Sequence, residues 1–213
     1  MRPFRILPML AACLGAAACT NEDIIEDGGV RVVRSACPAV AIPAETGDIT
    51  LFSAPGRTDA GALDVTAYIT RLRSSCGESG DQIVATATYE VNGVRRGDVS
   101  QAREVVLPTF ATMVQGGTVV VAKRQSRVLL RFEPGQARAS TTAQSTGVVT
   151  RAAATLPPET VRQLTRRRRP GDADAALDPL ADPAVRAAVQ RASFELLVGF
   201  QLTPEQLAYN ATR

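Results

Sequence analysis

Four cysteines are the residues of this chain best suited to covalent chemistry, and the sequence contains no histidine. Without an imidazole, Ser-His-Asp triads, Cys-His pairs and histidine-ligated metal sites are all excluded. Two carboxylates could still hydrolyse a glycosidic bond, but the candidates Glu78, Asp81 and Glu90 fall in turns or on alternating strand faces. Exposed, solubilising charge is the simpler interpretation there. We therefore predict that the protein is not an enzyme and needs neither a cofactor nor a metal.

Cys19 lies at the end of a leader that begins with two basic residues, Arg2 and Arg5. Residues 6–18 carry no charge, and an apolar run of about 13 residues is too short to cross a bilayer but typical of a secretory leader. Residues 16–18 are all alanine, and polar sequence begins directly after the cysteine. This pattern predicts a lipoprotein signal peptide over residues 1–18, with lipid attached to Cys19.

Two alternatives to this interpretation stay open. Cys13 also follows a leucine and small residues, although it would leave an apolar core of only residues 6–12. An ordinary secretory leader cut after Ala18 would leave Cys19 unmodified. Lipid on Cys19 would anchor the protein to the membrane permanently, since each buried methylene contributes about 0.8 kcal/mol. Thr20, where an aspartate would favour retention in the inner membrane, points to the outer membrane and its periplasmic face.

Charge separates the mature chain from nucleic-acid binders. Removing residues 1–18 from the 213 leaves 195 residues, enough for one well-filled domain. Removing Arg2 and Arg5 from the 24 basic residues leaves 22 against 21 acidic ones, a net charge of +1. A near-neutral domain lacks the electrostatic footprint of a nucleic-acid partner. Beyond the leader, no apolar run approaches the length of a transmembrane helix.

Cys37 and Cys76 are the two cysteines that follow the leader. An exported chain meets an oxidising compartment, where an even pair of cysteines usually bonds. Metal binding is the rival interpretation, but structural zinc sites take four nitrogen or sulfur ligands and this chain offers two. The two residues therefore predict a disulfide.

Short alternating segments separated by turn residues dominate the chain up to residue 149. Asn92-Gly93 and Gly116-Gly117 are strong hairpin signals, because tight hairpin turns need positive φ. Seven or so strands at hairpin spacing predict an all-β, immunoglobulin-like antiparallel sandwich. The expected strands are 49–52, 64–72, 83–91, 110–114, 118–123, 127–132 and 137–149, with further turns at 76–81 and 133–135.

The pattern changes near residue 151 and returns to a strand over 194–202. We interpret 151–191 as a partly helical insert before the last strand, with Asp182 as the cap of a short helix from Pro183. Thr203 and Gln206 form a capping-box pattern for a final helical turn. Residues 19–34 read as a flexible tether, so 35–213 form one sandwich domain.

Arg166, Arg167, Arg168 and Arg169 form the densest run of charge in the chain. Arginines near an anionic membrane surface attract its head groups, at about 1 kcal/mol each. The alternative is a solvated helix end that is balanced by the aspartates between residues 172 and 182. Those aspartates lack the glycine and the terminal glutamate of a calcium-binding loop.

The closing stretch 197–210, read as VGFQLTPEQLAYN from Val198, resembles the end of a group of uncharacterised proteobacterial outer-membrane lipoproteins. Shorter pieces fit that group in order, at 37–38, 106–108, 121–123 and 132–136, although the long insert departs from it. The resemblance implies a lipoprotein with a β-sandwich and brings no catalytic residues. Independently of the resemblance, the apolar and aromatic side chains of Phe200, Leu202, Leu207 and Tyr209 should fasten the end of the chain to the core.

Together these features predict an outer-membrane-anchored periplasmic lipoprotein. We expect a non-catalytic accessory or scaffold protein that contacts the membrane through its N-terminal lipid and engages another envelope protein. The alternative is a binding module for envelope glycan or anionic lipid.

Overall fold

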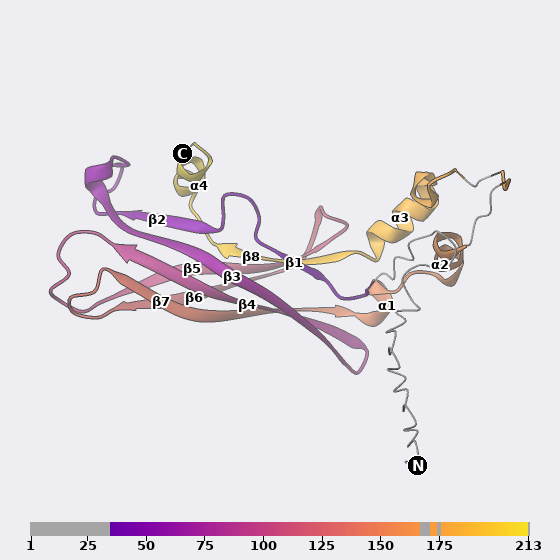
Figure 1. Cartoon of the computed structure of the whole chain (residues 1–213), viewed down its shortest axis with the longest axis horizontal. Coiled ribbons are helices and arrows are strands. Elements are labelled where there is room, and N and C mark those ends of the chain that lie inside the picture. Colours follow the sequence, from indigo (N-terminus) through magenta and orange to yellow (C-terminus); the bar gives the residue numbers. More distant parts are fainter. Residues whose placement is uncertain (1–34, 167–170, 174–175, 213) are drawn as a thin grey trace, which may run out of the picture. The chain divides into compact units, whose positions relative to one another are not determined.

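The computed structural model describes residues 35–166, 171–173 and 176–212, and residues 35–213 belong to one compact unit. Its body is a sandwich of two four-stranded sheets, which confirms the predicted all-β class (Figure 1). One sheet has the strand order β1-β8-β5-β6 and the other has the order β2-β3-β4-β7. The strands are β1 (Ala39–Ala41), β2 (Asp48–Phe52), β3 (Leu63–Ser79), β4 (Gln82–Arg95), β5 (Arg103–Gln115), β6 (Val119–Phe132), β7 (Arg138–Thr150) and β8 (Phe194–Phe200).

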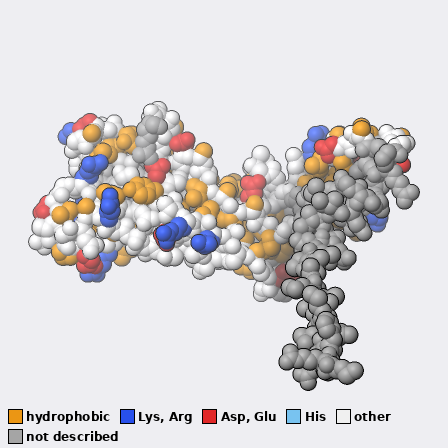
Figure 2. Space-filling view, in the orientation of Figure 1, with side chains coloured by type: hydrophobic (Ala, Val, Ile, Leu, Met, Phe, Trp, Pro, Cys, Tyr) orange, Lys and Arg blue, Asp and Glu red, His pale blue; other side chains and the backbone are white. Residues whose placement is uncertain are grey.

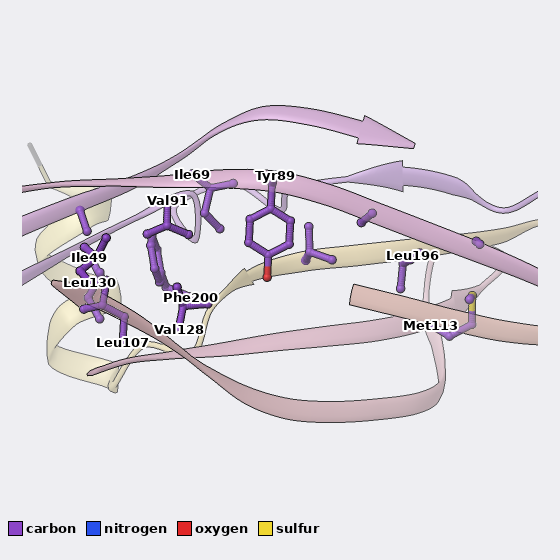
Figure 3. Packing of buried hydrophobic residues seen from close by; sticks show 14 of the residues in the cluster. Ile49, Ile69, Tyr89, Val91, Leu107, Met113, Val128, Leu130, Leu196 and Phe200 are labelled. Carbon is purple, nitrogen blue, oxygen red and sulfur yellow. The ribbon is translucent and has the colours of Figure 1, made fainter. Parts of the chain in front are cut away.

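Strand β4 shows why the chain forms a sandwich. Every second residue from Ile83 to Arg95 is buried, and the residues between them are half-buried. Such alternation places one face of the sheet on the core. Tyr89 stands in the middle of this row and points between the sheets (Figure 3), where its hydroxyl lies 3.3 Å from the Ser145 hydroxyl. Large apolar side chains from both sheets meet there, among them Ile49, Val91, Leu107, Leu130, Leu196 and Phe200.

The predicted hairpin turn at Asn92-Gly93 is wrong, because β4 runs straight through both residues. Gly93 is needed for a different reason. A Cβ built on it would meet Leu130 Cδ1 at 2.5 Å and Phe132 Cζ at 3.3 Å. The glycine therefore lets the opposite sheet approach the backbone of β4 closely. The Asn92 amide pairs with the neighbouring strand instead, donating to Thr70 Oγ1 at 2.7 Å.

The turn predicted over 76–81 is shorter than expected. Strand β3 extends to Ser79, β4 begins at Gln82, and Gly80 has a positive φ of 60°. Strand β3 also contains a bulge between Thr70 and Arg73, with Arg71 at φ 52°. The extra residue reverses the alternation along the strand: Leu72 packs against the core, whereas Arg71 lies outside and pairs with Glu90.

The β1-β8-β5-β6 sheet brings together the first and the last strand of the domain in sequence. Strand β1 pairs with β8, and this ladder is parallel, whereas the other ladders in the described residues are antiparallel. Strand β8 lies between β1 and β5 and is almost fully buried. Strands β5 and β6 form a long hairpin around Gly116 and Gly117, as predicted. Each is longer than the short segments expected from sequence.

Between β7 and β8 the chain forms the predicted helical insert. It contains α1 (Arg151–Ala154), α2 (Pro158–Thr165), the short 3₁₀ turn η2 (Pro179–Ala181) and α3 (Pro183–Arg191). Asp182 caps α3 as expected, since its carboxylate accepts from the Ala184 amide at 2.8 Å.

After β8, Thr203 and Gln206 form the predicted capping box at the start of α4 (Pro204–Ala211). Phe200 is buried and Leu202 packs against the core, while Tyr209 meets the Phe52 ring edge-to-face at 5.2 Å. The expectation for Leu207 is wrong, because it is 44% exposed. Asn210 does the anchoring instead: its amide donates to the carbonyls of Glu45 (2.8 Å) and Asp48 (2.9 Å).

Candidate interaction surface

The predicted disulfide between Cys37 and Cys76 is confirmed, with the two Cα atoms 6.1 Å apart. Cys37 precedes β1 of one sheet, and Cys76 lies in β3 of the other. The bond therefore fastens the two sheets together near the start of the domain. On the chain-entropy account, a cross-link over a separation of 39 residues stabilises the fold by about 4 kcal/mol.

The predicted lipid site Cys19, its alternative Cys13, the leader 1–18 and the tether 19–34 all lie outside the described residues. The attachment of lipid therefore stays a prediction from sequence. Within the described ranges, none of the helices has the length and apolarity needed to cross a bilayer.

Of the arginine run, the structure describes Arg166, whereas Arg167, Arg168 and Arg169 lie outside the described residues. Arg166 directly follows α2, and its guanidinium comes within 3.9 Å of the Asp172 carboxylate. Both side chains are exposed, so an ion pair of this kind contributes at most about 1 kcal/mol. The described part of this region thus contains one arginine of the run, at the end of a helix and beside an aspartate.

Two of the candidate carboxylates, Glu78 and Glu90, lie far apart on the β3–β4 hairpin. Glu90 pairs with Arg71 and Glu78 with Arg151. Glu78 lies opposite Ile83 in the β3–β4 ladder, so it is displaced from Glu90 by about seven residues, or roughly 23 Å. Glycosidases hold their two carboxyl groups about 5–10 Å apart. The pair Glu78 and Glu90 therefore cannot act together on one glycosidic bond.

Asp81 lines an open depression of ≈ 510 Å³ where the β3–β4 turn meets α1. The rest of its lining comes from 150–152 and 155–157, and its polar side chains are those of Asp81, Thr150, Arg151 and Thr155. Arg151 is held there by the Glu78 carboxylate and the Gly80 carbonyl. No group of three or more Cys, Asp or Glu side chains within the described ranges could hold a metal ion.

Strand β6 carries the most distinctive exposed surface of the domain, and sequence reasoning missed it. It is an edge strand of its sheet, so one side of its backbone has no partner strand in the described chain. All residues from 119 to 127 are exposed on both faces, and burial begins only at Val128. We call this segment, 119–127, the β6 edge. A free edge of nine extended residues spans about 30 Å.

The β6 edge is basic and partly apolar. Lys123, Arg124 and Arg127 lie on it, and the whole strand Val119–Phe132 contains no acidic residue. Lys123 sits over the Phe110 ring at 5.5 Å, whereas neither Arg124 nor Arg127 has an ion pair with a described residue. Residues 119–121 are three valines that are 56%, 60% and 47% exposed. On the face of the molecule shown in the space-filling view, basic, acidic and apolar side chains are interspersed (Figure 2).

The other three edge strands, β1, β2 and β7, differ from the β6 edge. Strand β1 has three residues and β2 has five, which is too short for an extended partner to pair over a long span. Strand β7 has thirteen residues, but its outward positions are mostly Ser, Thr and Gln, and its inward ones are half-buried. A sequence signal for the β6 edge did exist: three basic residues follow three valines, without an acid in the strand.

Comparison of the chain with protein-family models, with curated proteins and with solved structures finds no match.

Proposed function

We propose that this protein is an outer-membrane-anchored periplasmic lipoprotein, a non-catalytic accessory or scaffold that engages another component of the cell envelope. The leader and Cys19 support the location. The β6 edge is the observation that best supports engagement of a partner, since an unpaired strand of this length is a template for pairing with another chain. The wide separation of Glu78 from Glu90 and the open form of the depression beside Asp81 support the absence of catalysis.

For the sandwich we propose the immunoglobulin-like arrangement. Its hallmark is that two consecutive strands cross between the sheets and each pairs with one of two later strands that cross likewise. Here β4 pairs with β7 in one sheet, and β5 pairs with β8 in the other. In this view, the short parallel strand β1 occupies the place beside β8 that a final strand would otherwise take.

Two measurements on the native protein test the proposed function. Mass spectrometry of the mature N-terminus should find a lipid-modified Cys19 in the outer-membrane fraction. Cross-linking in intact cells, followed by purification of the protein, should recover a specific envelope partner. An uncleaved N-terminus on cytosolic protein would refute the location, and the absence of any cross-linked partner would refute the scaffold role.

The alternative function, a binding module for envelope glycan or anionic lipid, rests on the arginine run that begins at the exposed Arg166. Replacing Arg166, Arg167, Arg168 and Arg169 by glutamine should then weaken binding of the protein to anionic vesicles. A glycan array on the same protein tests for sugar binding. Unchanged vesicle binding and an empty array would remove the alternative.

A further inference from the structure

We propose that the β6 edge binds an extended, acidic polypeptide segment of the envelope partner, which adds to the sheet as an antiparallel strand beside β6. This inference rests on the proposed function and names the chemistry of the partner at one surface. In strand addition the main chain supplies the hydrogen bonds, and alternate side chains supply the specificity.

Backbone geometry makes the β6 edge available for such pairing. From residue 122 onward, β6 forms an uninterrupted ladder with β5, in which Ala122 faces Met113 and Arg127 faces Pro108. Alternate backbone groups of β6 are used in that ladder, so the others point away from β5. Over 122–127 no side chain is buried, and a strand could therefore approach without displacing core residues.

The positions of the charges define which strand fits. Lys123 and Arg127 share one face of the sheet because they are four residues apart in a regular strand, and Arg124 lies on the other face. Side chains directly opposite one another in antiparallel strands are about 5 Å apart, and opposite charges there stabilise the pair. A partner with acidic residues at alternate positions would meet both Lys123 and Arg127.

The same charges argue against a second copy of this chain as the occupant. Two β6 edges side by side would bring Lys and Arg side chains against Lys and Arg, which is unfavourable. Cationic residues on an edge strand commonly protect it from self-pairing. An acidic strand escapes that repulsion, and so the edge can select its partner by charge.

The apolar start of the β6 edge extends the footprint of the partner. Val120 pairs with Val114 across a bulge that falls between Met113 and Val114, and Val119, Val120 and Val121 are about half exposed. Isolated exposed valines are ordinary, whereas three in a row at the end of a free edge provide apolar area for contact. We therefore expect apolar residues in the partner beside this end of β6.

The test uses the full-length lipidated protein in detergent and a synthetic peptide of about ten residues, in which Glu alternates with Val and Thr. Hydrogen exchange measured by mass spectrometry should show new protection within 119–127 when the peptide binds, because the free amides of β6 become paired. Two control peptides should bind far more weakly: one with Gln in place of every Glu, and one with alternate backbone amides methylated.

The variant K123E/R124E/R127E should weaken binding of the acidic peptide about tenfold or more, since the attractive contacts at Lys123 and Arg127 become repulsive and the edge as a whole becomes acidic. A matched variant, R96E/R162E/R186E, changes the same number of exposed basic residues away from β6 and should bind like the wild type. Equal unfolding midpoints for both variants and the wild type would show that the fold is intact.

Several outcomes would overturn the inference. These are absence of peptide binding, binding without protection at 119–127, equal binding of the amide-methylated peptide, and equal loss of binding in the matched variant. Protection of 119–127 before any peptide is added would also overturn it, if neutralising Glu22, Asp23, Glu26 and Asp27 removed that protection, because the chain's own acidic segment would then be the occupant.

Failure of this inference can be told apart from failure of the proposed function. If K123E/R124E/R127E still cross-links to the envelope partner of the wild type in cells, the scaffold role stands and the β6 edge is not its surface. If the wild type finds no partner and Cys19 carries no lipid, the proposed function itself fails.

Discussion

Arg95 provides the sharpest test of how the domain is held together. Its side chain is 3% exposed at the end of β4. The guanidinium donates to four backbone carbonyls, those of Val99 (2.9 Å), Gln101 (2.8 Å), Glu133 (3.2 Å) and Gln136 (2.9 Å). It thereby joins the β4–β5 loop to the β6–β7 loop, and it also covers the Phe132 ring at 5.4 Å.

The substitution Arg95→Met keeps a long apolar side chain but removes all five donors. Four carbonyls would lose their hydrogen-bond donor, which lowers the free energy of unfolding by about 1 kcal/mol each. About 1 kcal/mol of this loss would be offset, because water can hydrate the loops and a cation no longer has to be buried. We therefore expect the free energy of unfolding to fall by about 3 kcal/mol. For a domain of this size that corresponds to roughly 6–12 °C in Tm.

Urea unfolding followed by circular dichroism, with the disulfide intact, measures this loss. The neighbouring Arg96 is exposed, so Arg96→Met is a matched control that should change stability by no more than about 0.5 kcal/mol. Arg95→Lys should fall between the two, because an ammonium cannot reach four carbonyls in the fork geometry of arginine. If Arg95→Met unfolds within 1 kcal/mol of the wild type, the assignment of Arg95 as a structural clamp is wrong.

Three further predictions concern stability. The double variant C37S/C76S should lower the free energy of unfolding by about 4 kcal/mol. Dithiothreitol should lower the urea midpoint of the wild type to that of the variant, and it should leave the midpoint of the variant unchanged. The Arg103 guanidinium, 2.6 Å from both carboxylate oxygens of Asp64, lowers the pKa of that carboxyl by hydrogen bonding and by its charge. Because the pKa of Asp64 is lower in the folded state than in the unfolded chain, where it is near 4, the ionised carboxylate stabilises the fold above about pH 4, and this stability is lost as the pH falls through the folded-state pKa. The variant Asp64→Asn should therefore lose less stability than the wild type in an acid titration followed by circular dichroism. In a thermal melt, Asn210→Ala should destabilise the domain by about 2 kcal/mol, since two part-buried carbonyls lose the donor that ties the end of the chain to them. Leu207→Ala should cost little, because Leu207 is 44% exposed.

Local signals in the sequence predicted the elements whose causes are local. The Asp182 cap, the Thr203 capping box and the Gly116-Gly117 turn each depend on neighbours within a few residues, and the structure bears out all three. The hairpin signal at Asn92-Gly93 failed, because a contact with residues distant in sequence determines the need for glycine there. Gly93 satisfies a close approach of the opposite sheet, which no local pattern can reveal.

Other features depend on the order of the strands and could not be predicted from one sequence. The parallel pairing of β1 with β8 joins residues more than 150 positions apart. The free edge of β6 exists only because β6 ends its sheet. Arg95 could have been found, because it continues the buried alternation that runs from Ile83 through Tyr89. An arginine in such a row predicts a buried cation with backbone partners.

The place of β8 also governs the order in which the domain can be completed during synthesis. An inner strand of the β1-β8-β5-β6 sheet comes from residues 194–200, so β1 has no neighbour until nearly the whole chain has emerged. Strands β2, β3, β4 and β7 can pair once residue 150 has been made, but the apolar face of their sheet is not fully covered until β8 is also in place. A chaperone that shields nascent strands would thus be needed longest by this sheet. A stop codon before residue 194 would leave one complete sheet and the β5–β6 hairpin, without the strand β8 that joins β1 to β5 and closes the core.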